Sequence, residues 1–241
     1  MLFHSWRGVV GVVKPTYRPG SLEEFIRLLP EGIGVVPMYL GIKSGTEAEF
    51  MAAMDPIKAK VAELAKLGVD IIHPEGAPPF MLRGYQGEAE IIKEMEQKHG
   101  KPVYTSGTSQ VEALQALGVK KMVGITYFVG DINQKYARYF NEAGFEVLAM
   151  EGITVPFADV GRLSPQEVYA FAKEEFLKHP GAEGIYLLGT AWRCLDMIKE
   201  LEQDLGVPVV HPVPARVWAT QKRLHVRQSV KGFGRLLEDM P

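Results

Sequence analysis

The chain repeats its pattern of residues at one fixed separation, and this repeat limits the fold more than any other feature. Gly124 follows Gly11 by 113 positions, and Gly189 follows Gly76 by the same 113. Each repeat alternates short apolar runs with helical patterns, and the apolar runs end in glycine and other small residues. We therefore predict an α/β fold of two pseudosymmetric Rossmann-like halves, each a parallel four-stranded sheet flanked by helices. The halves are residues 1–105 plus 212–241, and residues 106–211.

The predicted elements follow from apolar periodicity and turn residues. Ser21 with Glu24 fits a capping box that opens the first helix, and Ser164 with Glu167 fits another. Pro56 predicts a kink or break in a long helix. The strands are predicted at residues 9–13, 33–40, 71–72, 103–105, 122–126, 145–149, 185–188 and 207–210; the later helices are predicted at 46–67, 88–99, 110–117, 131–143, 165–179, 192–205 and 212–224.

The charge balance and the cysteine count exclude several classes of protein. With 27 Lys+Arg against 29 Asp+Glu, the formal charge of −2 provides no basic surface for nucleic acid or for an anionic membrane. The single cysteine, Cys194, excludes an internal disulfide and fits a reducing compartment. No secretory signal is visible, and no apolar run approaches the roughly 20 residues that span a bilayer. We expect a cytoplasmic protein, with the oligomeric state left open.

Two parallel sheets that face each other bring the carboxyl ends of their strands around one cleft, where such sheets usually bind ligands. Backbone amides at residues 76–77 and 189–191 are donors suited to a carboxylate or an enolate oxygen. The alternative is that Gly76 and Gly189 only permit tight turns. The candidate residues at the strand ends are Lys14, Thr16, Tyr17, His73, Glu75, Gly76, Ala77, Ser106, Thr126, Tyr127, Phe128, Gly189, Thr190, Ala191, Trp192 and His211.

Glu75 is the main candidate for a general acid or base, if the cleft desolvates it and raises its pKa. The alternative is an ion pair with Arg83 or Lys14. His73 and His211 end strands in different halves, so they are either a proton relay or structural residues. A metal needs about three protein ligands, and because only Glu75 offers a third beside the two histidines, we expect no metal.

Cys194 lies inside a predicted helix, where a buried packing role is the natural interpretation. Tyr127 and Trp192 are interpreted either as lining for a substrate pocket or as packing residues. No glycine-rich phosphate loop and no serine nucleophile elbow occur in the sequence.

Several short motifs lie at matching places along the chain: Gly100-Lys101-Pro102-Val103, Ser106-Gly107-Thr108, Asp131-Ile132-Asn133, Leu205-Gly206-Val207-Pro208 and Gly232-Phe233-Gly234-Arg235. Together they resemble the aspartate/glutamate racemase superfamily over nearly the whole chain. The resemblance is closest to the arylmalonate decarboxylase branch, with maleate cis-trans isomerase next. It implies cofactor-independent chemistry at a carbon next to a carboxylate.

The resemblance also places the catalytic positions of the superfamily on this sequence. The two cysteine positions fall on Gly76 and Gly189, a tyrosine position falls on Phe128 beside Tyr127, and hydroxyl-bearing positions fall on Ala77 and Pro78. Racemisation and cysteine-addition isomerisation need those thiols. Decarboxylation needs mainly a pocket that stabilises an enediolate, together with a proton donor.

We therefore expect a lyase that acts on a small carboxylate, with Glu75, His73, Tyr127 or Thr190 as the proton donor. The alternatives are a maleate isomerase or racemase type of isomerase, a hydratase or hydrolase with non-thiol acid/base chemistry, and a protein that only binds small carboxylates.

Overall fold

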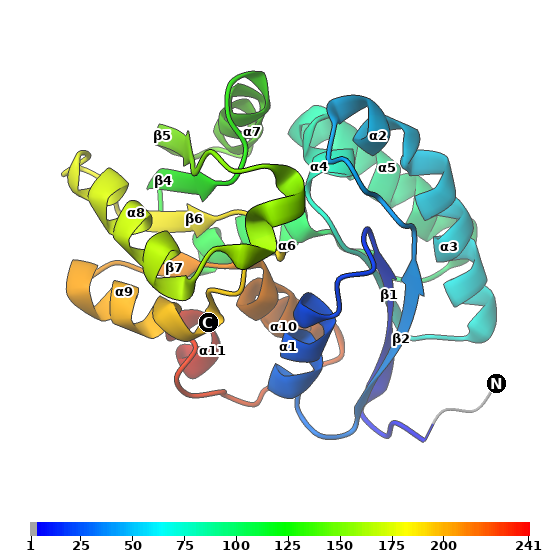
Figure 1. Cartoon of the computed structure of the whole chain (residues 1–241). Helices are drawn as coiled ribbons and strands as arrows, with labels where there is room; N and C mark the ends of the chain where they lie inside the picture. Colours follow the sequence, from blue (N-terminus) through cyan, green and yellow to red (C-terminus); the bar gives the residue numbers. More distant parts are fainter. Residues whose placement is uncertain (1–3) are drawn as a thin grey trace.

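A computed structural model describes residues 4–241 and contains two separate parallel β-sheets (Figure 1). The first sheet has the order β2 (Ile33–Tyr39), β1 (Gly8–Lys14), β3 (Ile71–Pro74). The second has the order β5 (Glu146–Gly152), β4 (Lys121–Thr126), β6 (Gly184–Leu187), β7 (Val209–Val210). The predicted strand at 103–105 is reduced to a single parallel bridge between Val103 and Ile72, so the first sheet has three strands and not four.

Helices surround both sheets and fill the space between them (Figure 1). Helix α3 packs on β1 and β3, α8 packs on β4, and α10 packs against both α6 and α1. The helices are α1 (Gly20–Leu28), α2 (Glu47–Ala52), α3 (Met54–Leu67), α4 (Pro78–Met81), α5 (Gly84–His99), α6 (Ser106–Ala116), α7 (Asp131–Glu142), α8 (Pro165–Leu177), α9 (Ile198–Leu205), α10 (Pro212–Arg223) and α11 (Arg235–Asp239), with the 3-10 turns η1 (Phe157–Arg162) and η2 (Leu195–Met197).

The internal repeat is confirmed strand by strand. Strand β5 begins and ends 113 residues after β2, and β6 begins and ends 113 residues after β3. Strand β1 lies between β2 and β3 in the first sheet, and β4 lies between β5 and β6 in the second. Gly11 and Gly124 lie in these two connecting strands, where a side chain has no room. A Cβ at Gly11 would lie 2.9 Å from Leu64 Cδ2, and a Cβ at Gly124 would collide with Met150 Sδ. Glycine therefore lets the neighbouring side chains approach the strand closely.

One of the two predicted capping boxes is confirmed and the other is wrong. Ser164 and Glu167 form a reciprocal capping box at the start of α8. Helix α1 begins after Pro19 without a side-chain cap, because Ser21 and Glu24 are buried and Ser21 bonds to other buried groups. A second capping box, between Thr105 and Thr108, starts α6 four residues before the predicted helix.

Two helix predictions change in the structure. The break in the long helix falls at Ala53, and Pro56 lies in the first turn of α3, where its missing N–H costs nothing. The helix predicted from residue 192 begins only at Ile198, after η2. Cys194 therefore lies in the loop before the helix and not inside it.

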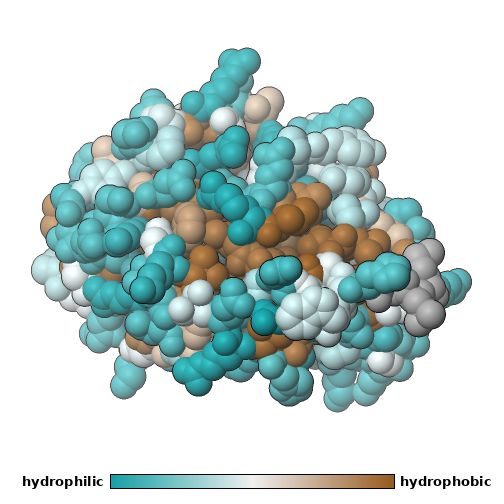
Figure 2. All heavy atoms as spheres, turned by 90° about the horizontal axis from the view of Figure 1, so that it is seen from below, coloured by the Kyte–Doolittle hydropathy of each residue, from teal (hydrophilic) through white to brown (hydrophobic). Residues whose placement is uncertain are grey.

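No helix within residues 4–241 is long and apolar enough to cross a membrane. Figure 2 shows a central band of hydrophobic residues, bordered by hydrophilic ones, on the face seen from below. The most exposed large hydrophobic side chains are Trp6, Tyr17, Leu177, Val129 and Ile26.

Glu88 on α5 is a fully buried carboxyl group that contacts α6 and α7. Thr105 Oγ1 donates to Glu88 Oε1 over 2.5 Å, and Tyr139 Oη donates to Glu88 Oε2. No basic side chain of residues 4–241 forms an ion pair with it. Burial raises the pKa of Glu88 to about 7, although the hydrogen bonds from Thr105 and Tyr139 oppose this shift.

The raised pKa of Glu88 makes stability depend on pH. The unfolded carboxyl ionises near pH 4.5 and the folded one near pH 7, so this group stabilises the fold below pH 4.5 and the stabilisation is lost as pH rises through 7. Glu88→Gln removes that loss. We expect urea unfolding to show the variant gaining about 3 kcal/mol relative to the parent protein between pH 4.5 and pH 8.

Glu90→Gln, on the exposed face of the same helix, is the matched control and should show no such change with pH. A Glu88→Gln difference that stays constant from pH 4.5 to pH 8 would contradict the buried, unpaired carboxyl.

Candidate active site

A pocket of about 660 Å³, counting the solvent at its mouth, is lined by loops that follow the strands of both sheets. Nine of the predicted strand-end residues line it, and they come from both halves of the repeat. These residues are Thr16, Gly76, Ala77, Ser106, Tyr127, Phe128, Gly189, Thr190 and Ala191.

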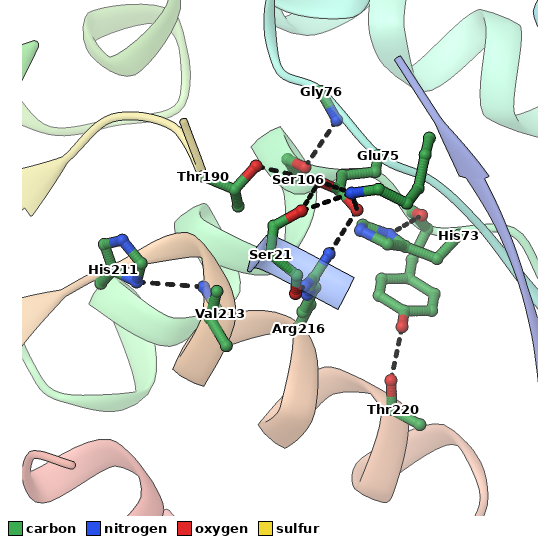
Figure 3. Close-up of polar contacts among 12 residues, drawn as sticks. Ser21, His73, Glu75, Gly76, Ser106, Thr190, His211, Val213, Arg216 and Thr220 are labelled. Atoms are coloured by element: carbon green, nitrogen blue, oxygen red, sulfur yellow. Dashed lines mark hydrogen bonds and ion pairs between the residues drawn. The ribbon is translucent and has the colours of Figure 1, made fainter. Parts of the chain in front are cut away.

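Glu75 lies behind this lining, at the centre of a buried polar cluster (Figure 3). Arg216 Nη1 donates to Glu75 Oε2 over 2.5 Å, and Lys14 Nζ lies 3.2 Å from Oε1. The hydroxyls of Ser21 and Thr190 each donate to Oε1 over 2.9 Å. Lys14 and Arg216 are each 1 % exposed and Glu75 is 2 % exposed, so these charges are satisfied by one another and not by bulk water.

The cluster fixes the ionisation of Glu75. Burial raises the pKa of this carboxyl, but the charges of Arg216 and Lys14 outweigh burial and hold the pKa well below its usual value. Of the two predicted partners, Lys14 is the one that pairs with Glu75; Arg83 instead donates to the carbonyl of Pro79. An ionised carboxylate with these partners has no proton to give, so the geometry favours a positioning role over the predicted role as proton donor.

Both predicted histidines are buried away from the pocket lining and from each other (Figure 3). His73 Nδ1 lies 2.9 Å from the carbonyl of Tyr104, whereas His211 Nδ1 accepts from Val213 N at the start of α10. Burial, with a smaller contribution from the charge of Arg216, lowers the pKa of each to about 3. They are neutral at physiological pH and do not form the shared relay that the sequence allowed.

Four further predicted contacts lie outside the pocket lining. Lys14 is occupied by Glu75, and Tyr17 is 70 % exposed and stacks on Tyr39. Thr126 Oγ1 lies 2.7 Å from Asn133 Oδ1 on α7, and Trp192 packs edge-on against Tyr127 with its ring centroid 5.0 Å away. Lys14, Thr126 and Trp192 are buried behind the pocket lining, whereas Tyr17 lies at the surface.

The predicted backbone donors divide into two groups. Gly76 N is already occupied, since it donates to Ser106 Oγ over 3.2 Å. The amides of Gly189, Thr190 and Ala191 donate to no group among residues 4–241, and all three residues line the pocket. The loop after β6 therefore offers adjacent N–H groups to an anionic oxygen.

Tyr127 occupies the space in which a side chain at position 189 would stand. Gly189 has a φ of 74°, and a Cβ built on it would collide with Tyr127 Oη. The Tyr127 hydroxyl donates to none of the described residues and belongs to the pocket lining. Burial raises the pKa of Tyr127, so its hydroxyl stays protonated.

Several site residues were missed by the sequence reasoning. Arg18, Gln110 and Phe157 line the pocket, and Arg216 completes the Glu75 cluster. Arg216 had a visible signal, because it is a lone charge in the apolar run Val213-Pro214-Ala215-Arg216-Val217-Trp218. Phe157 had none, since it belongs to a long loop with no periodic pattern.

Cys194 is fully buried and does not line the pocket. Burial raises the pKa of its thiol, which keeps it protonated and unreactive. Within residues 4–241 no three His, Cys, Asp or Glu side chains gather in a way that could hold a metal ion.

Two parallel sheets have strand-end loops that share one pocket, with a buried charge cluster behind it. This arrangement defines an α/β protein with a pocket at its strand ends. The family model described as arylmalonate decarboxylase matches residues 12–237. The chain belongs to the arylmalonate decarboxylase family.

Known relatives agree with this assignment. Arylmalonate decarboxylase of Bordetella bronchiseptica is 26% identical over 236 residues, which cover 95% of this chain and 96% of that protein. Maleate isomerase of Geobacillus stearothermophilus is 24% identical over 155 residues, covering 63% and 61%.

Solved structures agree as well. A double mutant of arylmalonate decarboxylase in the liganded form has a TM-score of 0.87 at 25% identity, covering 96% of this chain and 99% of that one. Maleate cis-trans isomerase of Nocardia farcinica, bound to TRIS, has a TM-score of 0.89 at 18% identity, covering 96% and 98%, which shows the shared fold.

Glu75→Gln tests the role of the buried cluster. The change leaves Lys14 and Arg216 buried without their carboxylate, and breaking such a pair typically costs about 3–5 kcal/mol of unfolding free energy. Urea unfolding at pH 7 measures this loss. Glu94→Gln, which breaks the exposed pair with Lys58, is the matched control and should change stability little. Equal effects of the two variants would refute the central role of Glu75.

Cys194 provides a second test. We expect iodoacetamide to leave the thiol of the native protein unmodified, because it is buried and protonated, and to modify it fully in urea. Mass spectrometry measures the modification. Cys194→Ala should keep any turnover found for the parent protein, and a loss of turnover with the fold intact would show that the thiol takes part.

Proposed function

We propose that this protein is a cofactor-independent lyase that removes carbon dioxide from a small substrate with two carboxylates on one carbon. The observation that carries this proposal is the Tyr127 hydroxyl, which stands in the pocket where a side chain at position 189 would be. By the resemblance, position 189 is the one from which the family delivers a proton. A hydroxyl in place of the thiol keeps a proton donor at the same point.

The proposed reaction has two steps. The bond between the central carbon and one carboxylate breaks, carbon dioxide leaves, and the electron pair forms an enediolate on the remaining carboxylate. The amides of residues 189–191 and the Ser106 hydroxyl are the donors available to stabilise the enediolate oxygens. A proton then moves from Tyr127 Oη to the carbon, and water returns a proton to the tyrosinate.

The ionisation of the site favours Tyr127 over the other predicted donors. Glu75 is held in its charged form, and the histidines are neutral and outside the pocket lining. Thr190 gives its one hydroxyl hydrogen to Glu75. Tyr127 keeps its proton, and the charge of Arg18 opposes the effect of burial on the Tyr127 pKa, which favours the transient tyrosinate.

Isomerisation of a maleate-like substrate is the second candidate, because maleate isomerases are among the relatives. Addition of a thiol to the double bond needs a cysteine in the pocket, whereas the described pocket lining contains none. Decarboxylation therefore ranks first.

A panel of substituted malonates, with maleate as the isomerase substrate, tests the proposal. We expect carbon dioxide release from at least one malonate and no formation of fumarate. Tyr127→Phe should lower turnover by about 10²-fold or more, because the proton donor is lost while the pocket keeps its shape. A Tyr127→Phe variant with normal turnover would exclude this tyrosine as the donor.

Tyr136→Phe is the matched control, since Tyr136 is also a buried tyrosine whose hydroxyl has no partner among the described residues, but it lies outside the pocket lining. Its turnover should stay at the parent level. Fumarate formation from maleate, without carbon dioxide from any malonate, would replace the lyase with an isomerase.

A further inference from the structure

Two polar atoms of the pocket residues have no hydrogen-bond partner within residues 4–241. One is Gln110 Oε1, an acceptor, and the other is Arg18 Nη1, a donor. Both residues line the pocket, at its α6 wall and in the loop after β1. A buried polar atom without a partner is costly, so two such atoms beside one pocket indicate what a ligand supplies.

The orientation of the Gln110 side chain is fixed by its other end. Its Nε2 donates to the carbonyl of Leu187 over 3.0 Å, and a carbonyl accepts only from N–H or O–H. The amide oxygen must therefore be the free atom. Gln110 is 0 % exposed, so this oxygen has no bulk water to replace a partner.

Neighbouring hydroxyls have the same polarity. Ser21 and Thr190 each carry one hydrogen, and both donate it to Glu75. Ser21 Oγ also accepts from Lys14 Nζ, whereas Thr190 Oγ1 accepts from no described residue. Thr190 and Gln110 are therefore acceptors in the pocket lining, which a carboxylate cannot satisfy.

Arg18 provides the opposite polarity. Its Nη2 donates to the carbonyl of Phe157 over 2.8 Å, and its guanidinium lies 4.9 Å from the centre of the Phe157 ring. These two contacts hold the guanidinium across the two halves of the chain. Because a guanidinium stays charged, its unpaired Nη1 is matched to an anionic oxygen.

We propose that the substrate is a carboxylate that also carries a hydroxyl or amino group, with Arg18 pairing with the carboxylate and Gln110 accepting a hydrogen bond from the second group. This inference rests on the proposed function, since it names the substrate class of the same pocket. A site that hydrogen-bonds a substrate hydroxyl discriminates strongly against an analogue that lacks it, because the buried acceptor is then left unpaired.

Binding of monocarboxylates tests the inference without requiring turnover. Phenylacetate, each enantiomer of mandelate, and each enantiomer of the O-methyl ether of mandelate differ only in one substituent on the carbon next to the carboxylate: hydrogen, hydroxyl or methoxy. By calorimetry, one mandelate enantiomer should bind about tenfold or more tightly than phenylacetate. The ether, which keeps the oxygen but lacks the hydrogen, should bind no better than phenylacetate.

Two variants assign the preference to its residues. Gln110→Met keeps the side-chain length and removes the acceptor, so the mandelate preference should fall to about twofold or less. Arg18→Met should weaken all the acids by about tenfold or more while leaving the mandelate preference in place. The neutral amide of phenylacetic acid, which lacks the charge, should lose little affinity in Arg18→Met.

The outcomes separate this inference from the proposed function. Equal binding of mandelate, its ether and phenylacetate to the parent protein overturns the inference, even if a malonate is decarboxylated and even if Gln110→Met fails to fold. A mandelate preference that survives in Gln110→Met also overturns the role of Gln110. A preference that depends on Gln110, without turnover of any malonate, supports the inference and removes the proposed lyase activity.

Discussion

The ionised carboxylate of Glu75 is the contact on which the arrangement of the site depends. It joins the end of β1 through Lys14, the start of α1 through Ser21, the loop after β6 through Thr190, and α10 through Arg216. A buried carboxylate is tolerated only when its partners surround it, so each of these elements is held at a fixed place relative to β3. The pocket loops of both halves are thereby positioned from behind by one side chain.

The charges of this cluster do not cancel within it. Two cations face one carboxylate, and the arginine cannot lose its proton. Burial has the largest effect on the pKa of Lys14 and lowers it. The charge of Glu75 raises this pKa and the charge of Arg216 lowers it, so the pKa of Lys14 stays below its usual value. His73 and His211 add no charge because they are neutral. With Lys14 protonated the cluster carries one net positive charge, the sign that suits the anionic substrate proposed above.

Local patterns predicted the fold well because the repeat and the strand ends are local features. The 113-residue separation read from the glycines also separates β2 from β5 and β3 from β6. Ser21 was misread because a capping box and a buried serine share the same local sequence; the contact that decides between them, with Glu75, joins residues 54 positions apart. Arg18 and Gln110 were missed because their partners, Phe157 and Leu187, lie 139 and 77 positions away along the chain. Long-range contacts of single polar side chains leave no periodic trace in a sequence.

The two glycines at the equivalent strand ends are not interchangeable in this pocket. Gly76 has a φ of 102°, and a Cβ there would lie 3.2 Å from the ring of Pro15, so backbone strain is the main obstacle to a side chain. At Gly189 the obstacle is also steric, because Tyr127 Oη fills the space. A side chain at 189 and the present position of Tyr127 therefore exclude each other. In this chain the phenol of Tyr127 fills that space, so a substitution at Gly189 must displace the Tyr127 ring.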